Sequence, residues 1–299
     1  MSKLLRFALL LGLCALTAPA VAANEDYWQK VGQALGKEGS QQPGQIYRVA
    51  LPRTDLHVTL DGVAIKPGLA LGGWLAFAAM NDNGMVMGDL VLTQDEIAPV
   101  MKKFEEGGIE ITALHNHLLR AEPMTLYMHV LGHGDPVKLA EALHAGLVLS
   151  KTPLQAGAAA PAAPPAIDFV TAVIDKEMGY SGRNNGGIYQ FTIPRGEPVT
   201  EGGREIPPAM GSAIGINFQP TGDGKAAITG DFLLAANEVD PVIKALTANG
   251  IEVTALHSHM LTEQPRMFFM HFWANDDAQK LARGLRAALD RIDVKKSGG

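Results

Sequence analysis

The sequence repeats itself at a constant offset of 142 residues. The stretch "GQIYRVALPR" at residues 44–53 returns as "GGIYQFTIPR" at 186–195, and "GIEITALHNH" at 108–117 returns as "GIEVTALHSH" at 250–259. A constant offset over this length predicts two homologous domains that differ by no net insertion. Because the copies are similar throughout, we expect them to pack face to face with pseudo-twofold symmetry; two independent units are the alternative.

The N-terminus has the three-part pattern of a secretory signal. Residues 1–22 combine a basic start, an apolar run at residues 7–16 and the small-residue sequence Ala-Val-Ala at the end. The apolar run is shorter than the roughly 20 residues that a membrane span needs, and no later segment is apolar enough to be one. We therefore expect cleavage near residue 23, no integral membrane segment in the mature chain, and a periplasmic or secreted protein.

An Ala/Pro-rich stretch separates the two copies. The sequence "LQAGAAAPAAPPA" at residues 154–166 has no apolar periodicity, which is typical of a semi-extended linker. The expected organisation is a signal peptide at 1–22, a first repeat at 24–150, a linker at 151–166 and a second repeat at 167–295.

Composition excludes several classes of function. The single cysteine, Cys14, lies in the predicted signal, so the mature chain has no disulfide, thiolate metal site or cysteine nucleophile. The formal net charge of −6 becomes −8 once the signal's Lys3 and Arg6 are removed, and the other basic residues are scattered. Nucleic acid and anionic membrane surfaces are poor partners for such a chain, because both are negatively charged and bind clustered basic residues.

Apolar periodicity predicts the same order of elements in each copy: helix, strands, helix, hairpin, helix. Trp28, Val31 and Leu35 mark the buried side of the first helix, and Thr93 with Glu96 forms a capping box before the middle helix. Turn residues separate the strand-like runs between them. The expected fold is α+β, with two tandem repeats that each hold a mainly antiparallel sheet, flanking helices and a β-hairpin that carries histidines.

Three histidines stand at the same spacing in each copy. The stretch "ALHNHLLRAEPMTLYMH" begins at residue 113 and "ALHSHMLTEQPRMFFMH" begins at residue 255. The histidines of these stretches are His115, His117, His129, His257, His259 and His271. A single histidine in a strand is usually a structural residue, but a set repeated in both copies favours a shared chemical role.

Side-chain alternation predicts how these histidines converge. In the strand at 109–117, His115 and His117 continue the apolar, core-facing row. If the following turn is centred near Glu122, the chain returns with His129 opposite His115 on the same face. The second copy repeats this arrangement, so we expect the three imidazoles of each copy to meet in one patch, subject to the register.

Converging neutral imidazoles are ligands for transition metals, and three histidines with an open position form a common catalytic or transport site. We therefore expect one metal site in each repeat, with zinc or copper as the ion: His115, His117 and His129 in the first, and His257, His259 and His271 in the second. Possible additional ligands are the turn glutamates Glu122 and Glu263, which are not at equivalent positions, and Asp89 and Asp231, which are. The aspartates are alternatively acceptors that orient an imidazole.

Several segments resemble the LppY/LpqO family of exported bacterial proteins. They are "YRVALPRTDLHVTLDGVAIKP", "GDLVLTQDEIAPVM", "GIEITALHNHLL" and "MHVLGHGDPVKLA", and the resemblance extends over nearly all of both repeats. It implies export and no particular activity or catalytic residue. The chain departs from the lipoproteins of that family because Leu13, not a small residue, precedes Cys14, so we expect no lipid anchor.

Three functions fit these observations. The leading hypothesis is an exported transition-metal-binding protein. The second is a metal-dependent hydrolase, in which the ion activates water and His133 or a turn glutamate serves as base. The third is a metal-free module whose histidines hydrogen-bond a small polar ligand in a pocket.

Overall fold

The computed structural model describes residues 20–78, 84–155 and 164–296. Positions 1–19 of the predicted signal peptide and residues 156–163 of the predicted linker lie outside these residues. The described chain mixes helices with antiparallel sheets in two successive units, so the predicted α+β class with tandem repeats is confirmed.

The first repeat folds into a six-stranded antiparallel sheet in the order β1-β2-β5-β6-β8-β7. Its strands are β1 (Ser40–Gln42), β2 (Ile46–Pro52), β5 (Gly72–Ala78), β6 (Gly84–Thr93), β7 (Glu110–His115) and β8 (Thr125–Gly134). Between β2 and β5 the chain forms a small hairpin of β3 (Val58–Leu60) and β4 (Val63–Ile65), followed by the short helix α2 (Pro67–Ala70). Because β7 is the edge strand, the predicted histidine segment lies at one side of the sheet.

The second repeat has the same strand order, β9-β10-β13-β14-β16-β15. Its strands are β9 (Arg183–Asn185), β10 (Ile188–Pro194), β13 (Ala213–Gly222), β14 (Lys225–Ala235), β15 (Glu252–His257) and β16 (Met267–Asp277). The place of the small hairpin and α2 is taken by β11 (Thr200–Glu201), β12 (Arg204–Glu205) and the 3-10 helix η1 (Pro208–Met210).

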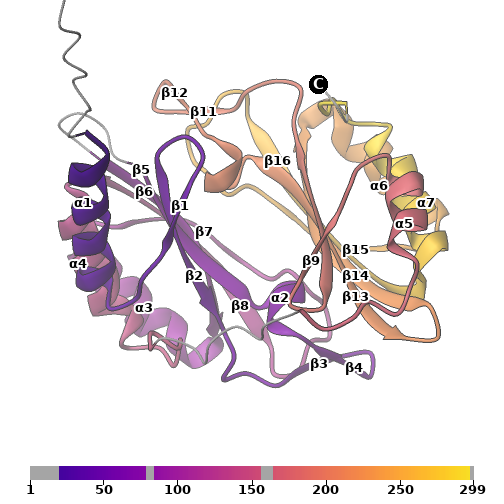
Figure 1. Ribbon diagram of the computed structural model, residues 1–299, viewed down its shortest axis with the longest axis horizontal. Helices are drawn as coiled ribbons and strands as arrows, with labels where there is room; N and C mark the ends of the chain where they lie inside the picture. Colours follow the sequence, from indigo (N-terminus) through magenta and orange to yellow (C-terminus); the bar gives the residue numbers. More distant parts are fainter. Residues whose placement is uncertain (1–19, 79–83, 156–163, 297–299) are drawn as a thin grey trace, which may run out of the picture.

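Helices cover the outer face of each sheet, and the two sheets lie between them (Figure 1). The first sheet is covered by α1 (Ala20–Leu35), α3 (Gln94–Glu106) and α4 (Pro136–Leu147), and the second by α5 (Thr171–Met178), α6 (Val239–Ala248) and α7 (Ala278–Leu289), with the 3-10 helix η2 (Ala236–Glu238) before α6. Trp28, Val31 and Leu35 of α1 are buried against the first sheet, as predicted. No helix in the described part of the chain is long and apolar enough to cross a membrane.

A buried arginine–glutamate pair joins a strand end to a helix start in each repeat. Arg53 Nη1 lies 2.7 Å from Glu96 Oε2, and that carboxylate also accepts the Thr93 N–H at 2.9 Å, which confirms the predicted capping contact. In the second repeat Arg195 lies 2.7 Å from Glu238. The offset of 142 therefore holds for buried polar contacts as well as for the sequence.

The inner faces of the two sheets pack against each other. Val91 and Tyr127 of the first sheet share an apolar cluster with Ile188 and Trp273 of the second. Polar contacts also join the repeats: Gln219 of β13 accepts the backbone N–H of Lys66 at 2.9 Å and donates to Ala64 O at 2.8 Å. The repeats therefore form four layers, helix, sheet, sheet and helix, and the surface between the sheets is available to build a shared site.

Candidate metal centre

A β-bulge decides which face of the first sheet the histidines occupy. Before the bulge Ile111 pairs with Val130, and after it Ala113 pairs with His129. Neighbouring residues of β8 point to opposite faces, so Ile111 packs beneath the helices whereas Ala113 and His115 face the second repeat. The expectation that the histidines continue the apolar row of this strand is wrong, because one extra residue reverses the alternation.

The second repeat has the same irregularity at the equivalent place. Val253 pairs with Phe272, and Ala255 pairs with His271 after a register shift. The histidines of both repeats are therefore buried by the other repeat and not by their own helices.

The register of the hairpin also differs from the expected one. His115 lies opposite Tyr127 and not opposite His129, and His257 lies opposite Phe269. The difference is two residues, and a shift of two residues keeps each side chain on its face. Both histidine strands therefore still present their imidazoles on the same side.

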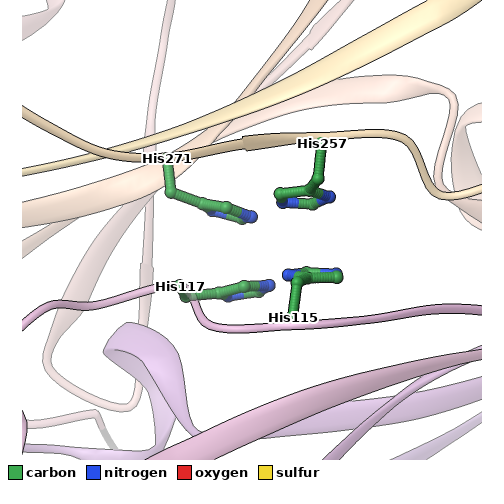
Figure 2. Close-up of side chains that lie close together, drawn as sticks. All are labelled: His115, His117, His257 and His271. Carbon is green, nitrogen blue, oxygen red and sulfur yellow. The ribbon is translucent and has the colours of Figure 1, made fainter.

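Six imidazoles meet between the sheets, and we call them the histidine cluster: His115, His117, His129, His257, His259 and His271. They form three stacks that each join the two repeats. The ring centroids are 3.4 Å apart in the His115–His257 stack, 3.5 Å in His117–His271 and 3.6 Å in His129–His259. Figure 2 shows the first two stacks, with a ring of one repeat over a ring of the other.

The three stacks follow the internal symmetry of the chain. The offset of 142 converts the His117–His271 stack into the His259–His129 stack, and it maps the His115–His257 stack onto itself. The pseudo-twofold axis of the two repeats therefore passes through the His115–His257 stack.

The cluster is buried, and its ring nitrogens are poorly satisfied. His129 is 4% and His271 is 1% exposed, and His115 and His257 are partly buried. Seven ring nitrogens are buried without a hydrogen-bond partner among the described residues, namely the Nε2 atoms of all six histidines and Nδ1 of His257. A buried polar atom without a partner costs about 1–3 kcal/mol, so this concentration indicates a place built to bind something.

Backbone carbonyls orient two of the rings. His115 Nδ1 lies 3.1 Å from Asn116 O, and His271 Nδ1 lies 2.9 Å from Gly230 O. Because a carbonyl oxygen only accepts, each Nδ1 carries the proton and each Nε2 presents a lone pair to the cluster. In this tautomer Nε2 is free to bind a metal ion.

Burial also favours the neutral form of five of the six imidazoles. Removal from water lowers the pKa of His115 to about 4 and that of His257 to about 3. The same cause, together with the neighbouring imidazoles, lowers the pKa values of His117, His129 and His259 well below their ordinary value. Neutral imidazole is the form that binds metal ions.

Two aspartates adjoin the cluster at equivalent positions of β6 and β14. Asp231 Oδ1 lies 2.9 Å from His271 Nδ1, and Asp89 Oδ1 lies 3.7 Å from His129 Nε2. Burial and the nearby Asp231 carboxylate raise the pKa of Asp89 well above its ordinary value. Burial alone would raise the pKa of Asp231 too, but its contacts with His271 outweigh burial and lower it. The surroundings therefore favour the protonated form of Asp89 and the ionised form of Asp231.

Four groups of these side chains bring their ligand atoms within 4.8 Å of one another. Two groups contain only histidines: the first is His115, His117, His257 and His271, and the second is His115, His129 and His259. Two more combine an aspartate with two histidines of its own repeat: Asp89 with His117 and His129, and Asp231 with His259 and His271. Among the described residues no group consists of the three histidines of one repeat. The three histidines expected to form a site in each repeat therefore do not form a group of their own; each repeat groups two of them with its aspartate, and the histidine-only groups take members from both repeats.

The other predicted ligands lie elsewhere. Glu122 is exposed in the loop between β7 and β8, and Glu263 is buried with its carboxylate accepting the Met267 N–H at 2.9 Å. His133, the alternative base, is exposed near the end of β8. In the part of the chain that the structure describes, the aspartates and not these residues stand beside the histidines.

Aromatic rings and a small cavity border the cluster. Tyr127 stacks on His117 at 3.3 Å and Phe269 stacks on His259 at 3.4 Å, so each repeat supplies an aromatic platform for one of its own histidines. A cavity of about 20 Å³ is lined by His129, His259 and apolar side chains. It has room for one water molecule.

Contacts that the sequence did not indicate hold the two histidine segments together. Asn116 donates its amide to Thr254 O at 3.3 Å, and the Thr254 hydroxyl donates to His117 O at 2.5 Å. Arg120 pairs with Asp61 and with Glu252 of the other repeat. These pairs join positions that are not related by the offset of 142, so the repeat pattern carries no signal for them.

Comparisons with known proteins give a family and no activity. No curated protein matches the sequence. Two solved structures have a weak likeness: the trimeric bacterial microcompartment shell protein PduB, with 12% identity over 88% of this chain and 97% of that chain and a TM-score of 0.22, and EtuB from Clostridium kluyveri, with 10% identity over 85% and 91% and a TM-score of 0.20. Likenesses this weak carry no conclusion about this protein. The pattern of one family matches the chain twice, at residues 29–148 and 172–291, which confirms the internal repeat, and the chain belongs to this family, described as Domain of Unknown Function (DUF1259).

Proposed function

We propose that this chain is an exported transition-metal-binding protein whose ligands come from both repeats. The observation that supports the proposal is the histidine cluster itself: six imidazoles, with seven buried ring nitrogens that have no hydrogen-bond partner among the described residues. Structural histidines are normally satisfied by hydrogen bonds. A set of unsatisfied lone pairs that converges on one place is the arrangement expected of a metal site.

The donor set favours zinc or copper. Imidazole nitrogen is a ligand of intermediate softness that suits both ions, whereas magnesium and calcium prefer oxygen ligands. The only cysteine of the sequence is Cys14, so thiolate ligation from the repeats does not compete with the histidines.

Only a small rearrangement is needed to bind an ion. Ligand atoms of the histidine groups lie within 4.8 Å of one another. Nitrogens on a tetrahedral zinc ion at about 2.0–2.1 Å are roughly 3.3 Å apart, so each must move by on the order of 1 Å. Rotation of the rings about their side-chain bonds provides movements of this size without moving the strands.

Titration of the chelator-stripped, tag-free protein with zinc and with copper tests the proposal. We expect a dissociation constant of about 1 μM or lower for at least one ion, which corresponds to about −8 kcal/mol. The variant His115→Ala/His257→Ala should lose this binding or weaken it at least tenfold. The matched control is His57→Ala/His133→Ala, which removes two exposed histidines outside the cluster and should bind as the wild type does. Failure of the wild type to bind either ion contradicts the proposal.

Export is a separate part of the proposal and has its own test. It is supported by the signal-like pattern of residues 1–22 and by the resemblance to the LppY/LpqO family. We expect the N-terminal residue of protein recovered from a bacterial periplasmic fraction to lie near position 23. Uncleaved protein that stays in the cytoplasm would contradict export and leave the metal site unaffected.

A further inference from the structure

We infer that the histidine cluster holds two metal ions, each on three histidines, and that each repeat donates its middle histidine to the site of the other. This inference rests on the proposed metal binding and specifies it. The first site consists of His115, His129 and His259. The second site consists of His117, His257 and His271.

The ligand distances give this grouping when only histidines are counted as ligands and each histidine binds one ion. His115, His129 and His259 form a complete group with ligand atoms within 4.8 Å of one another. The three histidines that remain all belong to the other histidine-only group, so they also lie within this distance. All six imidazoles are used once, and both sites have three ligands.

The internal symmetry of the chain supports the same partition. The offset of 142 converts His115 into His257, His129 into His271, and His117 into His259. Exchange of the two repeats therefore turns the first site into the second. Every ligand of one site therefore has an equivalent ligand in the other site.

The stacks explain why the middle histidines are exchanged. His117 lies in a stack with His271 of the other repeat, at 3.5 Å between ring centroids, and His259 lies in a stack with His129, at 3.6 Å. Within the second repeat, by contrast, the centroids of His259 and His271 are 6.5 Å apart. The middle histidine therefore lies nearer to the third histidine of the other repeat than to the third histidine of its own.

A single ion bound by four histidines would leave two buried histidines of the cluster without a ligand or hydrogen-bond partner among the described residues. The four-histidine group takes His115, His117, His257 and His271. It leaves the buried Nε2 atoms of His129 and His259 without a partner among the described residues. Two ions satisfy these nitrogens as well.

Each site has its own aspartate beside one ligand. Asp89 is 3.7 Å from His129 in the first site, and Asp231 is 2.9 Å from His271 in the second. The Asp231 carboxylate lies beside His271 Nδ1, so it orients that ring and leaves Nε2 free for the ion. Three protein ligands also leave a fourth position on each ion, and the water-sized cavity beside His129 and His259 adjoins the first site.

The first test counts the ions on the wild-type protein. Native mass spectrometry of the full chain with a small excess of zinc should show two ions per molecule. X-ray absorption at the zinc edge should then show three imidazoles per ion. One ion per chain, or four imidazoles per ion, overturns the inference while metal binding stands. No ion at all removes the proposed function itself.

Two matched double variants test the exchange of the middle histidines. His117→Ala/His271→Ala removes two ligands from the second site and should retain one ion. His117→Ala/His129→Ala also removes two imidazoles, but takes one ligand from each site, so both sites should weaken at least tenfold. Separate sites within each repeat predict the opposite ranking, because His117 and His129 would then share one site. The wild-type ion count and absorption spectrum decide the question if a variant does not fold.

Discussion

Acid should destabilise the metal-free protein steeply between pH 6.5 and pH 4. Five histidines of the cluster have pKa values below the ordinary value because they are buried; they are His115, His117, His129, His257 and His259. In the unfolded chain the same side chains titrate near pH 6.5. Between these limits the unfolded state binds protons that the folded state does not, so stability falls as the pH falls.

The magnitude follows from the number of protons. Each imidazole that is neutral in the folded state and charged in the unfolded state contributes about 1.4 kcal/mol per pH unit. Asp89 acts in the opposite direction, because its raised pKa means that the folded state keeps a proton that the unfolded state releases. With five imidazoles and one carboxyl of opposite effect, the unfolded state binds at most four more protons than the folded state at pH 5. The free energy of unfolding then changes by at most about 5 kcal/mol per pH unit. Since small proteins have about 5–15 kcal/mol of stability in total, one to three pH units are enough to unfold the protein.

Urea unfolding in the presence of chelator at pH 7, 6.5, 6 and 5.5 measures this slope. The variant His115→Leu/His257→Leu removes two of the titrating groups and should reduce the average slope over this range by about 1.7 kcal/mol per pH unit, because the imidazoles of the unfolded chain are only about 60% protonated there. His133→Ala, which changes an exposed histidine, should leave the slope unchanged. A wild-type slope below about 1.4 kcal/mol per pH unit over this range would refute the reasoning, because it would correspond to fewer than one buried neutral imidazole.

Two further predictions concern stability. Arg53→Met leaves the buried Glu96 carboxylate without its cationic partner, so the free energy of unfolding should fall by about 3–5 kcal/mol in urea titrations. Lys244→Ala breaks the exposed pair with Asp240 and should lower the free energy of unfolding by less than about 1 kcal/mol. Equal losses in the two variants would contradict a structural role for the buried pair. Zinc at 100 times its dissociation constant should raise the free energy of unfolding by about 2.7 kcal/mol for each occupied site, seen as a rise in melting temperature that EDTA reverses. An unchanged melting temperature would mean that zinc does not prefer the folded state.

Much of the architecture is contained in local sequence patterns. The offset of 142 predicts the two matching sheets, and helix periodicity predicts the buried side of α1, where Trp28 is 2% exposed. Capping residues also predict a helix start, since the Thr93 N–H donates to the Glu96 carboxylate at 2.9 Å before α3. Local patterns say less about the start of the second repeat, where the apolar Val170 is 67% exposed at the N-cap of α5.

The candidate site was predictable in composition but not in arrangement. The equal spacing of the histidines picks out all six members of the cluster. The face of the sheet on which their side chains lie depends on the β-bulge near Thr112 and on its counterpart in β15. No glycine or proline in these strands indicates a bulge. Their grouping depends on how one repeat packs on the other. The spacing of histidines within a repeat does not predict contacts between repeats. The aspartates of β6 and β14 are likewise brought to the cluster by strand pairing and not by nearness in sequence.

The central claim is a metal centre whose ligands come from both repeats, and anomalous diffraction tests it most directly. Crystals of the full chain grown with zinc would be measured on both sides of the zinc absorption edge. The account predicts anomalous peaks inside the histidine cluster, one next to His115, His129 and His259 and the other next to His117, His257 and His271. Peaks found only at exposed histidines such as His57 and His133, with none between the two sheets, would contradict it.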